Sequence, residues 1–200
     1  AQIYADTGIS LLAAQIYGND IDLIAKGARE FERRGAQVVD INFGCSVPKI
    51  VEKGCGAAYL RDLDRLYLAV QSTVEAVSVP VIVKTRIGWD ESDINILEVI
   101  RRCEDAGAKA VAIHARTVVQ KYKGRADWHW IGRAVEATEL AGLVDAHLGS
   151  PFGGSGLFSG EFRVDDLVGG DGARTHQPAE PSDLVFGLSL ADLGAGQGLL

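Results

Sequence analysis

An apolar, strand-like run followed by a helix-like stretch recurs four times in the first 140 residues of this chain. The strand-like runs cover residues 12–17, 37–42, 80–85 and 110–114, and the helical spacing of apolar residues covers 21–34, 63–77, 93–106 and 127–138. Parallel strands that helices cover on their faces are apolar on nearly every residue. The repeat therefore predicts an α/β protein with a parallel sheet and helices packed outside it.

Polar side chains stand at the carboxyl end of each predicted strand. Because the carboxyl ends of parallel strands meet at one rim, we expect a shared site there. The residues are Gln15, Asn42 and Cys45, Lys84 and Arg86, and His114 and Arg116.

The charged members of this set have both a structural and a functional interpretation. Lys84 and Arg86 lie two residues apart, so both point to the same side of the sheet. They form either a salt-bridged pair or a cationic clamp on the electron-rich edge of a flavin ring or on a nucleotide. His114 is either a satisfied core histidine or a hydrogen-bond partner of a cofactor.

The amides and the cysteine leave similar alternatives. Gln15 and Asn42 suit a pyrimidine-like edge because amides both donate and accept, although single amides are often structural. Cys45 follows Gly44 at a strand terminus, within a loop that also contains Gly54 and Gly56. It is either a small buried hydrophobe or a thiol that donates a proton. Cys55 and Cys103 are interpreted as structural.

The loop after the fourth predicted strand is basic and aromatic. Tyr122 and Lys123 lie between Lys121 and Arg125. Such a loop is either solvated or contacts RNA through phosphates and base stacking.

The composition changes abruptly after residue 140. Residues 141–200 hold 2 Lys or Arg against 8 Asp or Glu and contain 13 of the 24 glycines. We therefore expect two parts: a partial barrel domain over 1–140, and an irregular tail over 141–200 that is disordered or read out of frame. The cysteines show no metal-binding spacing, and no apolar run has membrane-spanning length. A reduced, cytoplasmic compartment without a membrane or metal partner is expected.

Five segments together resemble the tRNA-dihydrouridine synthases, in order and in spacing, over residues 12–140. They are AQIYG at 14–18, DINFGC at 40–45, VPKIVEKGCGAAYLRD at 47–62, PVIVKTRIGW at 80–89 and EDAGAKAVAIHARTVVQKYKGRADW at 104–128. The resemblance implies an FMN-binding (β/α)8 TIM barrel, of which about four βα units are recognisable here. It also implies a cytoplasmic monomer that reduces uridine to 5,6-dihydrouridine in tRNA with NADPH.

The resemblance also implies roles for individual residues. Cys45 is the catalytic acid by this resemblance, and the flavin is held by Gln15, Lys84 and His114. The substrate-binding residues that it implies are Asn42, Arg86, Arg116, Tyr122 and Lys123.

The chain departs from the family pattern in three ways. Ser46 stands where the family has proline after the cysteine. The chain is interpreted as truncated at both ends, and no glycine-rich phosphate site is recognisable after residue 140. We therefore expect the 200-residue chain to bind FMN weakly or not at all. Two alternatives stay open: another FMN-dependent barrel oxidoreductase such as a dihydroorotate dehydrogenase, and a non-catalytic degenerate fragment.

Overall fold

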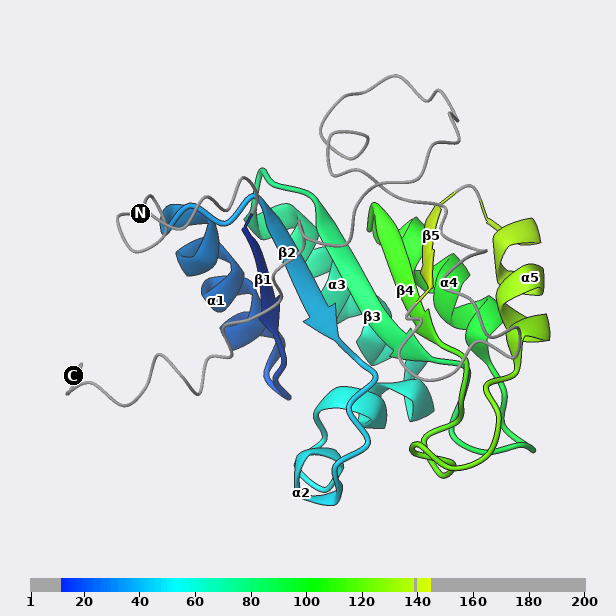
Figure 1. The fold of residues 1–200 in the computed structure, drawn as a ribbon. Helices are drawn as coiled ribbons and strands as arrows, with labels where there is room; N and C mark the ends of the chain where they lie inside the picture. The colour runs from blue at the N-terminus through cyan, green and yellow to red at the C-terminus, as the bar shows by residue number, and fades with distance from the viewer. Residues whose placement is uncertain (1–11, 139, 145–200) are drawn as a thin grey trace.

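The computed structural model describes residues 12–138 and 140–144. The elements alternate strand and helix along the chain (Figure 1). They are β1 (Ala13–Ile16), α1 (Ile21–Arg33), β2 (Val38–Asn42), α2 (Pro48–Val51), the 3₁₀ helix η1 (Gly56–Arg61), α3 (Leu63–Ala76), β3 (Val81–Arg86), α4 (Ile96–Asp105), β4 (Ala110–His114), α5 (Trp128–Glu136) and β5 (Ala141–Val144).

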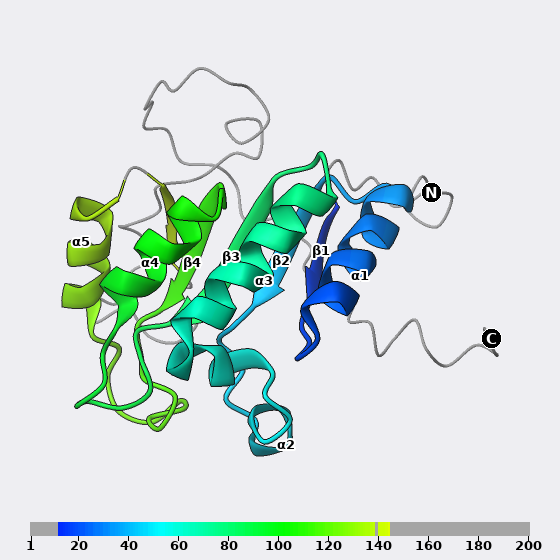
Figure 2. The ribbon, with the colours of Figure 1, turned by 180° about the vertical axis from the view of Figure 1, so that it is seen from behind.

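The strands form one parallel sheet in the order β1-β2-β3-β4-β5. Sequence neighbours are therefore also neighbours in the sheet, and each connection crosses back over the same face. Figure 2 shows helices α1, α3, α4 and α5 on that one face, with the strands behind them. All carboxyl ends lie at one edge, from which the loop that carries α2 projects (Figure 1). This is the edge where a (β/α) protein assembles its site.

The helix-covered face of the sheet holds the main core. Val39, Ile41 and Val83 on this face are fully buried, as are Leu66 of α3 and Ile100 of α4. Helix α1 begins at a capping residue: the side chain of Asp20 accepts from the backbone N–H of Leu23. The packing of these helices makes the sheet the rigid support of its carboxyl-end loops.

The opposite face of the sheet carries a small apolar layer and then polar residues. Ala13, Val38, Ile82 and Ala110 form a separate buried cluster on this face. Because side chains alternate along a strand, Gln15, Asp40, Lys84 and His114 lie on the same face, farther along their strands. This face, opposite the helices, thus changes from apolar to polar toward the carboxyl edge of the sheet.

The sequence predicted all four early strands and the four long helices to within a few residues, and β4 without error. It was wrong about where the regular structure ends, since β5 lies beyond residue 140 and pairs with β4. This strand is four residues long and contains Gly142, so it carries too little pattern to detect. Of the irregular tail expected over 141–200, residues 145–200 lie outside the described residues. None of the described helices is long and apolar enough to cross a membrane.

Candidate active site at the carboxyl ends of the strands

Gln15, Asn42 and the backbone of Cys45 are joined by a chain of hydrogen bonds. The N–H groups of Gly44 and Cys45 donate to Asn42 Oδ1 at 3.0 and 2.9 Å. Asn42 Nδ2 donates to Gln15 Oε1 at 2.9 Å, and Gln15 Nε2 donates to Asp40 Oδ2. The two amides predicted from sequence therefore lie together and connect the cysteine loop to the sheet.

Asp40 is the acceptor at the end of this chain, and the sequence reasoning did not assign it a role. Its side chain is buried, and its Oδ1 has no hydrogen-bond partner in the described structure. Burial raises the pKa of Asp40 to about 6, against the opposing effects of the Gln15 hydrogen bond and the Lys84 charge. The available signal was a carboxylate between the apolar residues Val39 and Ile41 of the strand VVDIN.

Cys45 is partly exposed and is held by close backbone contacts. Its carbonyl accepts from the N–H of Ala57 at 3.0 Å. Gly56 lies against it with φ +56°, and a Cβ there would lie 2.9 Å from Cys45 Cβ. Gly44 also passes close to β3, since a Cβ would lie 3.3 Å from the Thr85 carbonyl carbon. Gly44 and Gly56 therefore allow the backbone to pass close to its neighbours in this loop.

The other two cysteines are buried. Complete burial raises the pKa of the Cys103 thiol to about 12, and burial also raises the pKa of Cys55. Their structural interpretation fits this placement, and Cys45 is the more accessible thiol.

Arg86 connects three backbone segments around the site. Its Nε donates to the carbonyl of Gly44 at 2.8 Å, and its Nη1 donates to the carbonyls of Thr117 and Lys121 at 3.1 and 2.8 Å. Lys121 has a φ of 53°, in the left-handed region. The side chain is buried, and these hydrogen bonds make Arg86 a brace between the loops at the rim.

Lys84 and His114 come from the neighbouring strands. Lys84 pairs in register with Asn42 of β2, and His114 pairs with Arg86 of β3. His114 is buried, and its Nε2 lies 3.2 Å from Arg116 Nη1. Because a guanidinium only donates, Nε2 is the acceptor and the ring proton is on Nδ1. Arg116 also donates to the carbonyl of Gly124 at 3.1 Å.

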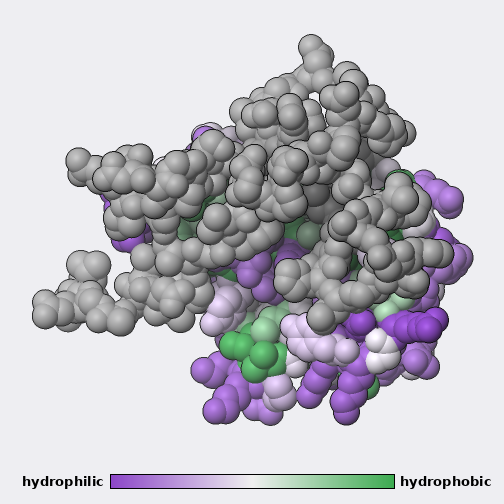
Figure 3. All heavy atoms as spheres, in the orientation of Figure 1, coloured by the Kyte–Doolittle hydropathy of each residue, from purple (hydrophilic) through white to green (hydrophobic). Residues whose placement is uncertain are grey.

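The basic aromatic loop lies at the outside of the rim. Tyr122 is 66% exposed, yet its ring centroid is 5.8 Å from that of His114. Lys123 is exposed on the same loop. Figure 3 shows that the described surface at this end is largely hydrophilic around a small apolar patch. The structure therefore brings Tyr122 next to the inner residues and leaves Lys123 toward solvent.

The order and spacing of these residues match a known family. A profile described as "Dihydrouridine synthase (Dus)" matches residues 2–141, which is more than half of the chain. The chain belongs to the dihydrouridine synthase family. Among the described residues no group of three or more His, Cys, Asp or Glu side chains could hold a metal ion.

Curated relatives agree with this family assignment. The chain is 41% identical over 137 residues to a "Probable tRNA-dihydrouridine synthase 1" of Synechocystis, covering 68% of this chain and 39% of that protein. It is 36% identical over 139 residues to "tRNA-dihydrouridine synthase B" of Vibrio vulnificus, covering 70% of this chain and 43% of the relative. The chain thus spans about two fifths of the length of these dihydrouridine synthases.

Solved structures agree on the fold. A structure titled "PhdJ bound to substrate intermediate" matches with a TM-score of 0.50 at 18% identity, over 68% of this chain and 43% of that one. The parallel β1–β5 sheet with its helices on one face is a partial (β/α)8 barrel, as the sequence predicted.

Proposed function

We propose that the protein to which this chain belongs reduces uridine to 5,6-dihydrouridine in tRNA, with FMN as its cofactor and NADPH as its reductant. One observation carries the proposal: polar groups from β1, β2, β3 and β4 converge on one face and one edge of the sheet, and hydrogen bonds link those of β1 and β2, and Arg86 of β3, to the loop of Cys45. Membership of the dihydrouridine synthase family supports the reaction class.

The residues present fit a flavin. Gln15 uses one N–H and one lone pair of its amide in the chain to Asp40 and Asn42, which leaves one donor and one acceptor position. Such a pair complements the pyrimidine-like edge of an isoalloxazine. Lys84 would place positive charge at the electron-rich edge, and His114 would bind the ring through its Nδ1 proton. FMN, when bound, supplies the hydride chemistry.

Cys45 is the proposed acid. Reduction of the uracil double bond adds a hydride to C6 and a proton to C5, and the Cys45 Sγ gives that proton and is later reprotonated from water. The hydrogen bonds from the N–H groups of Gly44 and Cys45 to Asn42 hold this thiol at the end of β2. A fixed loop is what proton transfer to one carbon atom requires.

The proposed substrate contacts divide into two groups. Asn42 and Arg86 lie at the inner rim. Asn42 Oδ1 accepts from two backbone N–H groups and one Nδ2 hydrogen donates to Gln15, so the second Nδ2 hydrogen is the one that can donate to a ligand. Arg86 and Arg116 hold the rim loops, and so shape the entrance for the base.

Tyr122 and Lys123 face the outside of the rim, where an unstacked nucleotide of tRNA would pass. Aromatic stacking and a phosphate contact are the interactions that these two side chains offer. The exposure of Tyr122 supports this role over a purely packed one.

The test is Cys45→Ala in the full-length enzyme. We expect retained flavin absorbance and a loss of dihydrouridine, measured by mass spectrometry of nucleosides from tRNA. Cys103→Ala, which removes a thiol from the core of α4, should retain product formation. Undiminished dihydrouridine in Cys45→Ala would remove Cys45 from its role. Activity on free dihydroorotate but not on tRNA would replace the proposed function with that of a dihydroorotate dehydrogenase.

A further inference from the structure

The hydrogen bonds that lead from the Cys45 N–H to Asp40 all run in one direction. The N–H of Cys45 donates to Asn42, the amide of Asn42 donates to Gln15, and the amide of Gln15 donates to Asp40. A series of amides whose donors all point the same way is polarised cooperatively when it ends on an anion. The end of this series is the carboxylate of Asp40.

We propose that Asp40 is a positioning residue that holds the loop of Cys45 in place through Gln15 and Asn42. This inference rests on the proposed function, because it gives Asp40 a purpose only if Cys45 delivers a proton. Asp40 does not touch Cys45 in the chain of contacts; it lies two residues before Asn42 on the same face of β2 and opposite Gln15 of β1.

The burial of Asp40 supports this role over a structural one. Asp40 is 1% exposed and its Oδ1 has no hydrogen-bond partner among the described residues, so burying this carboxylate lowers the free energy of unfolding. The charge that acts on it from the neighbouring strand is that of Lys84 on β3, while β1 offers only the neutral Gln15. A protein retains such a group where a site needs its charge.

The role predicts a pH dependence. The pKa of Asp40 is raised to about 6 by burial, so the carboxylate is charged at pH 7.5 and mostly neutral at pH 5. A hydrogen bond to a charged acceptor is stronger than one to a neutral acceptor, by a margin equivalent to about fivefold in an equilibrium constant. The loop should therefore open more often when Asp40 is protonated.

The experiment measures hydrogen exchange at the amides of Gly44 and Cys45 in the full-length enzyme, with rates corrected for intrinsic pH effects. Asp40→Asn keeps the shape and an acceptor oxygen but removes the charge. We expect about fivefold lower protection of these two amides at pH 7.5, and no difference from the unaltered enzyme at pH 5. Asp105→Asn makes the same chemical change on an exposed residue of α4 and should leave both amides unaffected.

A second variant tests whether the effect passes through Gln15. In a Gln15→Met background, which breaks the series without changing charge, Asp40→Asn should no longer alter the protection of Gly44 and Cys45. Equal protection with and without Asp40→Asn at pH 7.5 would overturn the proposal. A loss of protection that persists in the Gln15→Met background would also overturn it, since the effect would then be general destabilisation. Because the measurement uses neither uridine nor product, it can succeed even if the proposed reaction is wrong.

Discussion

Arg86 at the end of β3 and Gly44 in the loop after β2 are joined by a hydrogen bond of 2.8 Å from the guanidinium Nε to the carbonyl oxygen. Nη1 of the same side chain donates hydrogen bonds to two further carbonyls, those of Thr117 and Lys121. One buried side chain thus connects the loop of Cys45 to the loop of Tyr122.

Replacing this side chain should destabilise the fold. Arg86→Met leaves three carbonyl groups without their donor, and we expect a loss of about 3 kcal/mol in the free energy of unfolding, measured by urea denaturation. Arg86→Lys keeps the charge but not the guanidinium geometry, so its free energy of unfolding should lie between those of the unaltered protein and Arg86→Met. Arg29→Met, at an exposed position on α1, is the control and should change stability by less than about 0.5 kcal/mol. An Arg86→Met protein as stable as this control would contradict the bracing role.

Two glycines should respond in opposite ways to alanine. Gly56 has φ +56°, and an added Cβ would meet Cys45 Cβ and O at 2.9 Å, so Gly56→Ala should cost about 1–3 kcal/mol. Gly132, in α5, has nothing within 4 Å of the added atom, so Gly132→Ala should raise stability by about 0.5–1 kcal/mol. Thermal denaturation of both variants gives the comparison. If Gly56→Ala raised the stability instead, the Cys45 loop would have to move away from the added Cβ without a loss of stability.

Asp40 should make the protein less stable as the pH rises. Its folded pKa of about 6 lies above the ordinary value of 3.8, so its stabilising contribution is complete below pH 3.8 and is lost as the pH rises through about 6. The shift corresponds to roughly 3 kcal/mol. Asp40→Asn should remove this dependence and be at least as stable as the unaltered chain at pH 8. Urea denaturation of both proteins between pH 5 and 8 measures this pH dependence. A strongly destabilised Asp40→Asn protein at pH 8 would refute the prediction.

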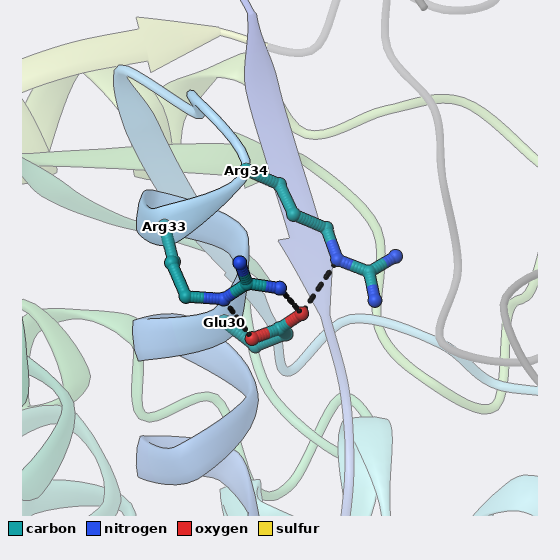
Figure 4. Close-up of polar contacts among 3 residues, drawn as sticks. All are labelled: Glu30, Arg33 and Arg34. Carbon is teal, nitrogen blue, oxygen red and sulfur yellow. Dashed lines mark hydrogen bonds and ion pairs between the residues drawn. The ribbon is translucent and has the colours of Figure 1, made fainter.

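Glu30 should show the opposite dependence. Figure 4 shows its carboxylate between the guanidinium groups of Arg33 and Arg34, with which it pairs at 2.7 and 2.6 Å. The hydrogen bonds from Arg33, then those from Arg34, lower the pKa of Glu30 to about 2. Its contribution to stability is therefore present above pH 4.5 and lost as the pH falls through about 2.

The carboxyl titration of Glu30 can be followed by NMR. Arg33→Met should raise the pKa of Glu30 more than Arg34→Met, because the Arg33 hydrogen bonds have the larger effect. High salt should also raise it, since the group is at the surface. A titration unchanged by salt and by both substitutions would show that the cluster does not form in solution.

Much of the fold could be predicted because the pattern is strong where helices cover the sheet. Strands such as Ala110–His114 are apolar up to their last residue, which is polar. Both features can be recognised from the local sequence. The strand Ala141–Val144 could not be predicted, because four residues with a glycine have no periodicity. The short helices α2 and η1 were also missed, since glycines and a proline within 44–56 indicate only a loop.

The sequence predicted that the strand-end residues of the candidate site share one rim, but not how they are connected. The rule that the carboxyl ends of parallel strands meet at one edge sufficed to place Gln15, Asn42 and His114 at one rim. It could not show that Arg86 turns to backbone carbonyls, because those belong to loops whose paths the sequence does not determine. It also passed over Asp40, since the meaning of a buried carboxylate depends on the side chain opposite it on another strand.

The layer formed by Ala13, Val38, Ile82 and Ala110 has a consequence for anything that enters from the rim. Two of its four members are alanines, so the surface that a planar molecule would meet is low and free of hydrogen-bonding groups. Gln15 and Asp40 stand two residues farther along their strands, about 7 Å above it. The depth to which a ring can sink is therefore set by methyl groups, whereas its orientation is set by the polar atoms above them.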